Sequence, residues 1–388
     1  GATLFTSGFA ETGTEEGIAL QAQIAEMAKR ANFNLIGPNC MGIFNPRVGL
    51  RHALDQYAGE GGPVGFISQS GTQNAFFSLL GMVNGVKVSK SVSYGNAIVL
   101  DSPDYLEYLA QDEDTRVIGM YIEGARDGRR LLRTLRDVTQ KKPVLIWKGG
   151  QTEEGARATS SHTGSLMESM TVWDAIMKQC GIIGVDTMEE MVDSIKALLY
   201  MKPGQGDRVG LVAMTGGQSV AITDAFARNG LRVPLLTQAS YDKLGAFFAT
   251  VGASYRNPLD AGSTFSASFD NLVKMLDIMK DDENVDVVVL EISVALFYRR
   301  WRRHDDFYSR LVQALVAFKA RCDKPFLTTL SPIHMEAKTL ELKQALTDRG
   351  ILSFTTFDSA ARALRKVIDY YRFHGLGVGH DAGFGVLF

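Results

Sequence analysis

The chain has 388 residues, enough for roughly two or three domains whose cores need neither disulfides nor metals. Lysine and arginine number 41 against 43 aspartates and glutamates, so the net charge of −2 gives no reason to expect a nucleic acid or a membrane surface as a partner. No apolar run reaches the ~20 residues that span a bilayer, and no signal peptide is visible. The three cysteines lie far apart and form no CxxC motif, which favours a reducing, cytoplasmic setting and no metal site of the chain's own.

The first fifty residues predict little regular structure. We expect a strand at Thr3–Thr6, a helix at Glu15–Arg30 and then the turn-rich segment Leu35–Pro46. This is too little for an independent α/β domain. We therefore expect residues 1–55 to be the last part of a domain whose beginning is absent.

From about residue 60 onward, short apolar runs alternate with amphipathic helices such as Asp127–Gln140 and Met188–Tyr200. The runs are apolar without alternation, which is typical of parallel strands covered on both faces. The alternation predicts doubly wound α/β domains. The predicted buried strands are Val64–Ile67, Val117–Ile122, Val144–Trp147, Val209–Ala213, Val285–Ile292 and Phe326–Leu330.

A divergent repeat suggests two similar domains. Pro63–Gly71 and Arg208–Gly216 each combine a strand with a small-residue turn before a helix, and each is followed later by an acidic residue at a strand end, Glu123 or Glu291. The turn-rich segment Met201–Asp207 predicts the linker between the two copies. The predicted regions are 1–55, a first domain at 60–202, a second at 207–374 and a flexible tail at 375–388.

The two repeated turns are candidate phosphate sites, because free N–H groups and the helix dipole favour an anion at a helix N-terminus. One phosphate could be held by both. Small residues also suit any tight strand-to-helix turn, so each turn alone is ambiguous. Neither turn matches GxxxxGK[ST] or GxGxxG, so nucleotide binding by those motifs is unsupported. The candidate residues are Ser68, Ser70 and Gly71 in the first turn and Gly216, Gly217 and Gln218 in the second.

His162 is a candidate phosphoryl carrier. Its small and hydroxylated neighbours Ser161, Thr163 and Gly164 predict a mobile loop, and a neutral imidazole nitrogen can attack phosphorus. A surface histidine without a role would have the same surroundings. Glu123 follows a predicted strand at the sheet edge where ligands bind, so it could hydrogen-bond a histidine ring or simply be solvated.

Other polar segments have simpler interpretations. The turn Asn257–Asp260 is explained by its own turn chemistry. The basic run Tyr298–Arg303 predicts a solvated helix face in a chain of net charge −2. The remaining five of the six histidines lack a setting like that of His162, so we expect them to be surface or structural residues.

Taken together, these segments resemble the NDP-forming acyl-CoA synthetases, the superfamily of acetate–CoA ligase (ADP-forming) and succinyl-CoA synthetase. The resemblance runs from about Ser7 to about Gly262 and keeps the family's order. The segments that carry it are Gly8–Gly13, Gly37–Gly42, Gly65–Gly71, Ser93–Ala97 with Asp101, Tyr121–Gly124, Lys148–Gly150, Glu154–Arg157, Ser161–Gly164, Thr215–Gly217 and Asn257–Asp260.

The resemblance implies two flavodoxin-like, succinyl-CoA-synthetase-like domains preceded by the remnant of a Rossmann-like CoA-binding domain. It also implies a reversible reaction in which acyl-CoA, NDP and phosphate give acid, CoA and NTP through an acyl phosphate and a phosphohistidine. His162 matches the phosphorylated histidine, and Glu123 matches the carboxylate that steadies it. The two repeated turns match the starts of the helices that hold the phosphate.

The same resemblance implies CoA as a cofactor, with ATP/ADP or GTP/GDP and Mg bound by an ATP-grasp module that this sequence lacks. An ATP-grasp subunit or domain is therefore an expected partner, in a homo- or hetero-oligomer, and the chain alone is expected to be unable to complete the cycle. The candidate residues for CoA and the acyl group are Gly37, Pro38, Asn39, Asn96, Asn257 and Asp260.

Two other functions stay open. A regulatory module that binds CoA or acyl-CoA without turnover would share the fold, but a sensor has no need of a phosphoryl carrier such as His162. A nicotinamide-dependent oxidoreductase is suggested only by the α/β pattern, and the missing GxGxxG argues against it.

Overall fold

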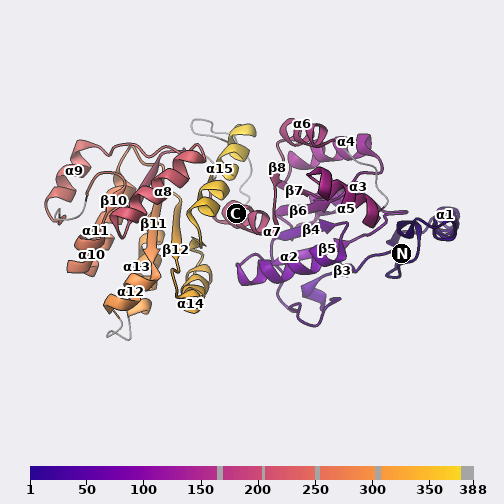
Figure 1. The fold of residues 1–388 in the computed structure, drawn as a ribbon, viewed down its shortest axis with the longest axis horizontal. Coiled ribbons are helices and arrows are strands. Elements are labelled where there is room, and N and C mark those ends of the chain that lie inside the picture. Colours follow the sequence, from indigo (N-terminus) through magenta and orange to yellow (C-terminus); the bar gives the residue numbers. More distant parts are fainter. Residues whose placement is uncertain (164–168, 203–205, 250–253, 302–306, 377–388) are drawn as a thin grey trace. The chain divides into compact units, whose positions relative to one another are not determined.

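The computed structural model describes residues 1–163, 169–202, 206–249, 254–301 and 307–376, with the backbone alone at 159–163, 266–267, 300–301 and 307. The chain forms two compact units (Figure 1). The first unit spans Gly1–Ile195 and the second begins at Lys196. The division between the units falls inside helix α7 (Met188–Tyr200). The domain limits expected from the linker at 201–207 remain a prediction. Among the described helices, none is both long and apolar enough to cross a membrane.

The first unit is built on a six-stranded sheet in the order β3-β5-β4-β6-β7-β8. All its neighbouring strands are parallel except β3, which runs antiparallel to β5. Without β3 this is the flavodoxin-like 2-1-3-4-5 order, which confirms the predicted α/β class. The strands are β3 (Gly42–Phe44), β4 (Val64–Ser68), β5 (Val88–Ser93), β6 (Val117–Ile122), β7 (Val144–Lys148) and β8 (Ile183–Val185).

Helices cover both faces of this sheet. α3, α4 and α6 pack on one face, where they share a buried apolar cluster with β4, β6 and β7. On the other face Phe66 of β4 stacks on Phe77 of α2 with ring centroids 3.9 Å apart, and Gly119 of β6 lies beside Met191 and Ile195 of α7. The helices are α2 (Gly71–Val83), α3 (Ser102–Gln111), α4 (Gly128–Thr139), α5 (Glu153–Thr163) and α6 (Met170–Cys180).

The N-terminal segment is tied to this sheet. Its own strands, β1 (Ala2–Thr3) and β2 (Leu35–Ile36), form a two-stranded parallel sheet, so the strand expected at Thr3–Thr6 is shorter and begins one residue earlier. Helix α1 (Glu15–Arg30) has the predicted bounds, and the short helices η1 (Ala10–Thr12) and η2 (Pro46–Val48) complete the segment. Because β3 pairs with β5, the segment and the first sheet share one hydrogen-bond ladder.

The second unit repeats the flavodoxin-like order in the five parallel strands β10-β9-β11-β12-β13. A buried apolar cluster joins the sheet to α11, α13 and α14, while α8 and α15 pack together outside that cluster. The strands are β9 (Val209–Ala213), β10 (Leu259–Asp260), β11 (Val287–Ser293), β12 (Phe326–Ser331) and β13 (Leu352–Phe354). The helices are α8 (Gly216–Arg228), α9 (Gln238–Gly245), α10 (Gly262–Ala267), α11 (Phe269–Asp281), α12 (Val294–Trp301), α13 (Phe307–Ala320), α14 (Glu336–Thr347) and α15 (Phe357–Phe373).

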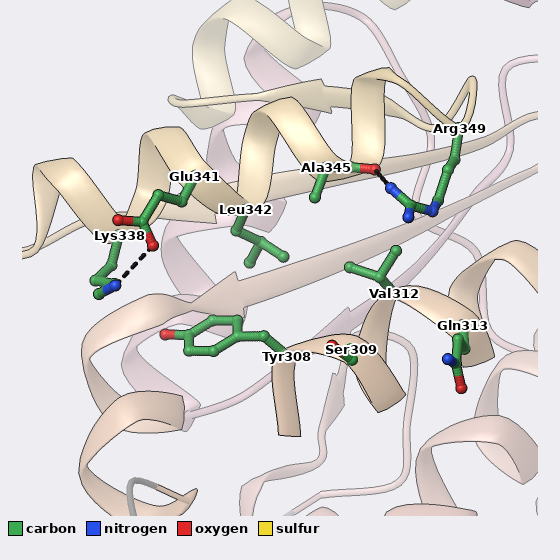
Figure 2. Close-up of a pocket in the computed structure, with 9 residues that line it drawn as sticks. All are labelled: Tyr308, Ser309, Val312, Gln313, Lys338, Glu341, Leu342, Ala345 and Arg349. Atoms are coloured by element: carbon green, nitrogen blue, oxygen red, sulfur yellow. Dashed lines mark hydrogen bonds and ion pairs between the residues drawn. The ribbon is translucent and has the colours of Figure 1, made fainter. Parts of the chain in front are cut away.

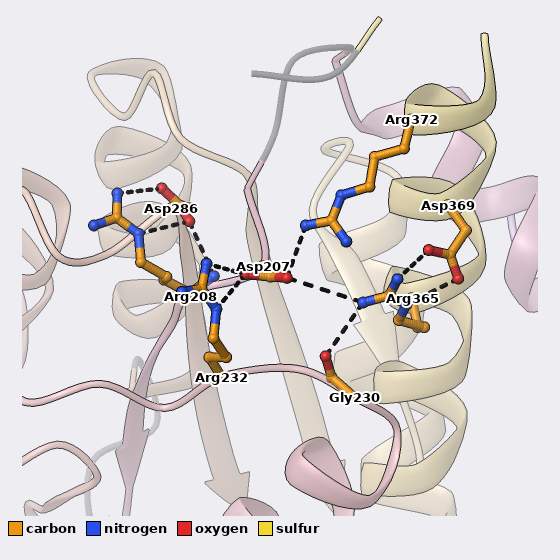
Figure 3. A network of polar contacts seen from close by, with 8 residues as sticks. All are labelled: Asp207, Arg208, Gly230, Arg232, Asp286, Arg365, Asp369 and Arg372. Atoms are coloured by element: carbon orange, nitrogen blue, oxygen red, sulfur yellow. Dashed lines mark hydrogen bonds and ion pairs between the residues drawn. The ribbon is translucent and has the colours of Figure 1, made fainter. Parts of the chain in front are cut away.

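Asp207 ties the C-terminal helix of the second unit to the start of β9 (Figure 3). Its carboxylate accepts hydrogen bonds from Arg232 and from Arg372 of α15, each at 2.7 Å. Burial alone would raise the pKa of Asp207, but the hydrogen bonds from the two arginines outweigh it and lower the pKa. The network therefore stabilises the second unit through an ionised carboxylate.

Candidate functional site

The turn between β4 and α2 is held by its own serines. The Ser68 hydroxyl donates to the backbone oxygen of Ser70 (2.7 Å) and accepts from its N–H (3.1 Å). Ser70 is the N-cap of α2, since its hydroxyl accepts from Gln73 N–H at 3.3 Å. A Cβ on Gly71 would lie 2.6 Å from Cγ of Met41, so a larger residue here would force the Met41 side chain to shift. The result is a rigid helix start at the carboxyl edge of the sheet, where backbone N–H groups favour an anion.

Glu123 lies at the same edge, directly after β6, and is 7% exposed. Its Oε1 accepts a hydrogen bond from the Tyr121 hydroxyl at 3.1 Å. Burial and the neighbouring Glu123 carboxylate raise the pKa of Tyr121, so this hydroxyl keeps its proton and remains a donor. The predicted carboxylate is thus placed beside the α2 turn with a fixed side-chain direction.

Two residues that sequence reasoning gave no role hold the backbone of Glu123. The side-chain oxygen of Gln69 accepts from the N–H groups of Glu123 and Gly124, the latter at 3.0 Å. The buried ammonium of Lys148 donates to the carbonyl oxygens of Glu123 (2.7 Å) and Gly149 (2.6 Å). The available signals were a long polar residue inside a turn of small residues and a lysine that ends an apolar strand.

His162 belongs to α5 of the first unit, which is helical through Thr163. The predicted loop is therefore helical in its first part. Thr152, whose hydroxyl accepts from Gly155 N–H at 3.1 Å, stabilises the start of this helix. The side chains of Ser161, His162 and Thr163, and Gly164 as a whole, lie outside the described residues. The backbone of α5 packs against η1 in the N-terminal segment.

The predicted CoA and acyl-site residues of the first unit come together, although they are far apart in sequence. Asn96 donates its backbone N–H to Pro38 (3.0 Å), and its side-chain oxygen accepts from Asn39 (3.3 Å). Its amide nitrogen donates to Glu11 at 2.6 Å. Burial opposes ionisation of Glu11, but this bond and backbone N–H donors lower its pKa. Gly37, whose φ is +102°, begins this turn.

A cavity of about 470 Å³ opens beside this cluster and is lined in part by Cys40 and Met41. Met41 also abuts Gly71, so the cavity adjoins the α2 turn. Burial raises the pKa of the Cys40 thiol to about 11, and its sulfur donates to the carbonyl oxygen of Leu4 at 3.4 Å. Cys40 is therefore a protonated thiol at neutral pH and a poor nucleophile.

The second unit places its predicted phosphate residues in the first turn of α8. Thr215 caps this helix by accepting from the N–H of Gln218 at 3.3 Å, and Gly216 and Gly217 are its first two residues. Asp260 faces the same helix start, because a Cβ on Gly216 would lie 3.0 Å from its Oδ2. Each unit thus has its own capped helix start at the carboxyl edge of its sheet.

Asn257 has a structural role. Its side-chain oxygen accepts from Leu211 N–H (2.9 Å), and its amide donates to the carbonyl oxygens of Val209 (2.9 Å) and Pro234 (2.8 Å). It is 6% exposed, so its hydrogen-bonding groups are used within the scaffold. We therefore leave Asn257 out of the site proposed below.

The two acidic residues of the sequence repeat are not equivalent. In the first unit Ser68 of β4 pairs with Tyr121 of β6. The equivalent strands of the second unit are β9 and β11, and their register, continued by one residue, places Glu291 at the position of Tyr121. The position of Glu123 is taken by Ser293. Glu291 is fully buried, and burial raises its pKa to about 7. Spacing along the chain could not reveal this two-residue offset, because it depends on strand register.

A pocket of about 250 Å³ lies between α13 and α14 (Figure 2). Lys338 and Glu341 on its rim form an ion pair at 2.7 Å, and Arg349 donates to the carbonyl oxygen of Ala345 at 2.9 Å. The charged side chains that line this pocket thus bind one another or the backbone. We therefore do not include the pocket in the candidate site. Within the described ranges no cluster of three His, Cys, Asp or Glu side chains could hold a metal ion.

Residues 61–198, which include β4 to β8, match the succinyl-CoA ligase-like flavodoxin domain. The alpha subunit of acetate–CoA ligase (ADP-forming) II from Pyrococcus furiosus is 32% identical over 379 residues, which cover 97% of this chain and 80% of that protein. Acetate–CoA ligase (ADP-forming) I from Archaeoglobus fulgidus is 37% identical over 289 residues, which cover 74% of this chain and 41% of the relative's length.

A solved structure gives the same result for the fold. Acetyl-coenzyme A synthetase 1 of Ca. Korarchaeum cryptofilum, in complex with phosphate and ADP, superposes with a TM-score of 0.81 at 26% identity, covering 97% of this chain and 78% of that one. Fold, turns and matched domain define a CoA-ligase type of α/β protein. The chain belongs to the family of ADP-forming acyl-CoA synthetases, which includes these acetate–CoA ligases.

Proposed function

We propose that this chain is the CoA-ligase portion of an NDP-forming acyl-CoA synthetase and that His162 carries the phosphoryl group. The observation that supports this best is Glu123, a nearly buried carboxylate fixed at the carboxyl edge beside the capped start of α2. A carboxylate at such an edge can accept a hydrogen bond from a histidine ring. The helix start can hold the phosphoryl oxygens.

The proposed step begins with an acyl phosphate. A neutral ring nitrogen of His162 attacks phosphorus, an N–P bond forms as the P–O bond to the acyl group breaks, and the acid leaves as a carboxylate. The other ring nitrogen keeps its proton, and Glu123 accepts a hydrogen bond from it. This contact stabilises the positive charge that the ring acquires. Ser68, Ser70 and Gly71 form the phosphate-binding turn.

The remaining steps use CoA and a nucleotide. We propose that the cluster of Gly37, Pro38, Asn39 and Asn96 contacts CoA or the acyl group, and that the nucleotide and Mg bind to an ATP-grasp subunit or domain. The Pyrococcus relative is named a subunit alpha, and the Korarchaeum structure holds ADP and phosphate. The first supports a partner subunit, and the second supports a reaction that uses ADP and phosphate. Asp260, at the start of α8, remains a candidate for the acyl site.

Labelling with inorganic phosphate tests the proposal. The longest native form of the chain is incubated with labelled phosphate, CoA and a panel of acyl-CoAs, beside His162→Ala and the control His334→Ala from the exposed surface of the second unit. We expect acid-labile, base-stable label on the native chain and the control, and none on His162→Ala. Label that persists in His162→Ala would overturn the assignment. A native chain that binds CoA but takes no label would favour the regulatory module.

A further inference from the structure

Two side chains hydrogen-bond the backbone of Glu123, one at its N–H and one at its carbonyl oxygen. Neither side chain has a part in the proposed phosphoryl transfer or in the cap of α2. Gln69 binds the N–H of Glu123, and Lys148 binds its carbonyl oxygen at 2.7 Å. Gln69 is itself anchored, because its own N–H donates to the carbonyl oxygen of Tyr121 at 3.2 Å. Its side chain thus continues the hydrogen-bond ladder between β4 and β6 past the ends of both strands.

The second unit shows that the fold does not require these contacts. Strand register places Met214 at the position of Gln69, Leu330 at that of Lys148 and Ser293 at that of Glu123. Met214 and Leu330 are 5% and 0% exposed, so apolar side chains fill these positions in a sheet of the same strand order. A buried lysine is costly and rarely kept without a reason. The first unit has the buried Lys148 where the second has Leu330, and it has Glu123 where the second has Ser293.

We propose that Gln69 and Lys148 are positioning residues that hold Glu123 in the direction needed by the phosphorylated histidine. The inference rests on the proposed roles of His162 and Glu123. A carboxylate that stabilises a developing charge must be in place beforehand, since reorganisation during the reaction adds to the barrier. A displacement of about 1 Å can lower a rate on the order of 100-fold. Gln69 and Lys148 prevent such a displacement of the Glu123 peptide.

Gln69→Met tests this cleanly, because it installs the residue that the second unit carries and removes the acceptor at similar length. We expect the rate of phosphate labelling at saturating acetyl-CoA to fall about 10- to 100-fold, with the KM for phosphate unchanged. Gln69→Glu keeps an acceptor for both N–H groups and should restore part of the rate, with a shifted pH profile. Gln140→Met, an exposed site at the end of α4, should label like the native chain.

Gln69→Asn is the second variant, since its shorter amide stays polar at a half-buried turn but falls short of the Glu123 N–H. Thermal unfolding of each variant shows whether it is folded. Native-rate labelling by folded Gln69→Met and Gln69→Asn would overturn the positioning role while leaving the proposed function intact. Absence of label on the native chain would instead count against the proposed function itself. An equal loss in Gln140→Met would also overturn the inference.

Discussion

The α2 turn of the first unit and the α8 turn of the second share a fold but differ in the polar residues around them. Both helices start after a buried strand, and both are capped by a hydroxyl that accepts from the N–H three residues on, Ser70 in one and Thr215 in the other. Around the α2 turn lie two serines and, at the ends of the next strands, Glu123 together with the buried Lys148. At the α8 turn Asp260 lies beside the first residue of the helix.

Glu291 adds to this difference, because its Oε2 accepts from the Met214 N–H just before the α8 turn, at 2.9 Å. Asp260 lies against the helix start itself, so in its ionised form it would compete with a phosphate for the positive end of the helix dipole. We therefore expect the α2 turn to bind phosphate more tightly than the α8 turn. The comparison also shows that a capped helix start is a property of the fold, while anion binding depends on the residues around it.

The largest expected effect is on the rate of phosphate labelling, and it should differ between the equivalent positions Glu123 and Ser293. Glu123→Gln should lower the rate of phosphate labelling on the order of 100-fold or more, because the amide cannot supply the negative charge that stabilises the phosphorylated ring. Ser293→Ala should leave the rate within about twofold. Labelling time courses with acetyl-CoA measure both. A native rate in Glu123→Gln would remove the carboxylate from the mechanism.

Glu291 makes the stability of the second unit depend on pH. Its pKa of about 7 lies above the ordinary 4.5, so the folded chain keeps a proton that the unfolded chain releases. Stability therefore falls as pH rises from about 4.5 to about 7, by roughly 3 kcal/mol, and then levels off. Glu291→Gln should abolish this slope in urea unfolding at pH 5, 6.5 and 8. The exposed control Glu60→Gln should keep it, and a slope that survives in Glu291→Gln would contradict the assignment.

Asp207 should act in the opposite direction on the acidic side. Its pKa is lowered by the arginines, so its contribution is present above the ordinary aspartate pKa and is lost as pH falls through the lowered value. Asp207→Asn should cost about 1–2 kcal/mol at pH 7 and remove that acid-dependent loss. Asp369→Asn, whose carboxylate is 53% exposed, should cost less than about 0.5 kcal/mol. Urea unfolding between pH 3 and pH 7 checks both, and equal costs would show that the Asp207 network adds no stability.

The smallest changes in stability are expected from alanine substitutions at glycines of the two turns. No atom lies within 4 Å of a Cβ added to Gly217, so Gly217→Ala should fold normally and change stability by at most about 1 kcal/mol. Gly71→Ala should destabilise more, because its methyl group meets Met41. Thermal unfolding gives the stabilities, and calorimetric titration with inorganic phosphate gives the affinities. Weaker phosphate binding in folded Gly217→Ala would show that the α8 turn also contacts the anion.

Much of the fold could be predicted because its central strands are continuous apolar runs. Helix α7 has the predicted bounds, and β6 and β9 match their predicted runs. Strand β5 was missed because serine alternates with valine and lysine along Val88–Ser93, which leaves no continuous apolar run, and edge strand β3 was missed because it is short. Continuous apolar runs identify the central strands, but they do not show which polar segments complete the sheet.

For the candidate site, sequence correctly placed Glu123 and the α2 turn at one edge, because parallel strands end at the same edge. The contacts of Gln69 and Lys148 could not be predicted, since they depend on which carbonyl and N–H groups face each side chain. For the same reason, the sequence could not show that Glu123 and Glu291 occupy positions two residues apart. The sequence gives the identity of each residue, whereas its hydrogen-bond partner depends on how the paired strands are aligned.

Helix α7 has a consequence for any attempt to dissect the chain. Its start belongs to the first unit, while Lys196, near its end, donates to the carbonyl oxygen of Ser353 at 2.7 Å and lies 4.4 Å from the ring centroid of Phe354. A cut at the expected linker 201–207 would leave Lys196 on the first fragment and its partners on the second. A fragment ending there would carry an uncovered helix end, and a fragment starting there would lack a piece of its own core. A second-unit fragment should therefore begin before Lys196, so that this lysine stays with Ser353 and Phe354.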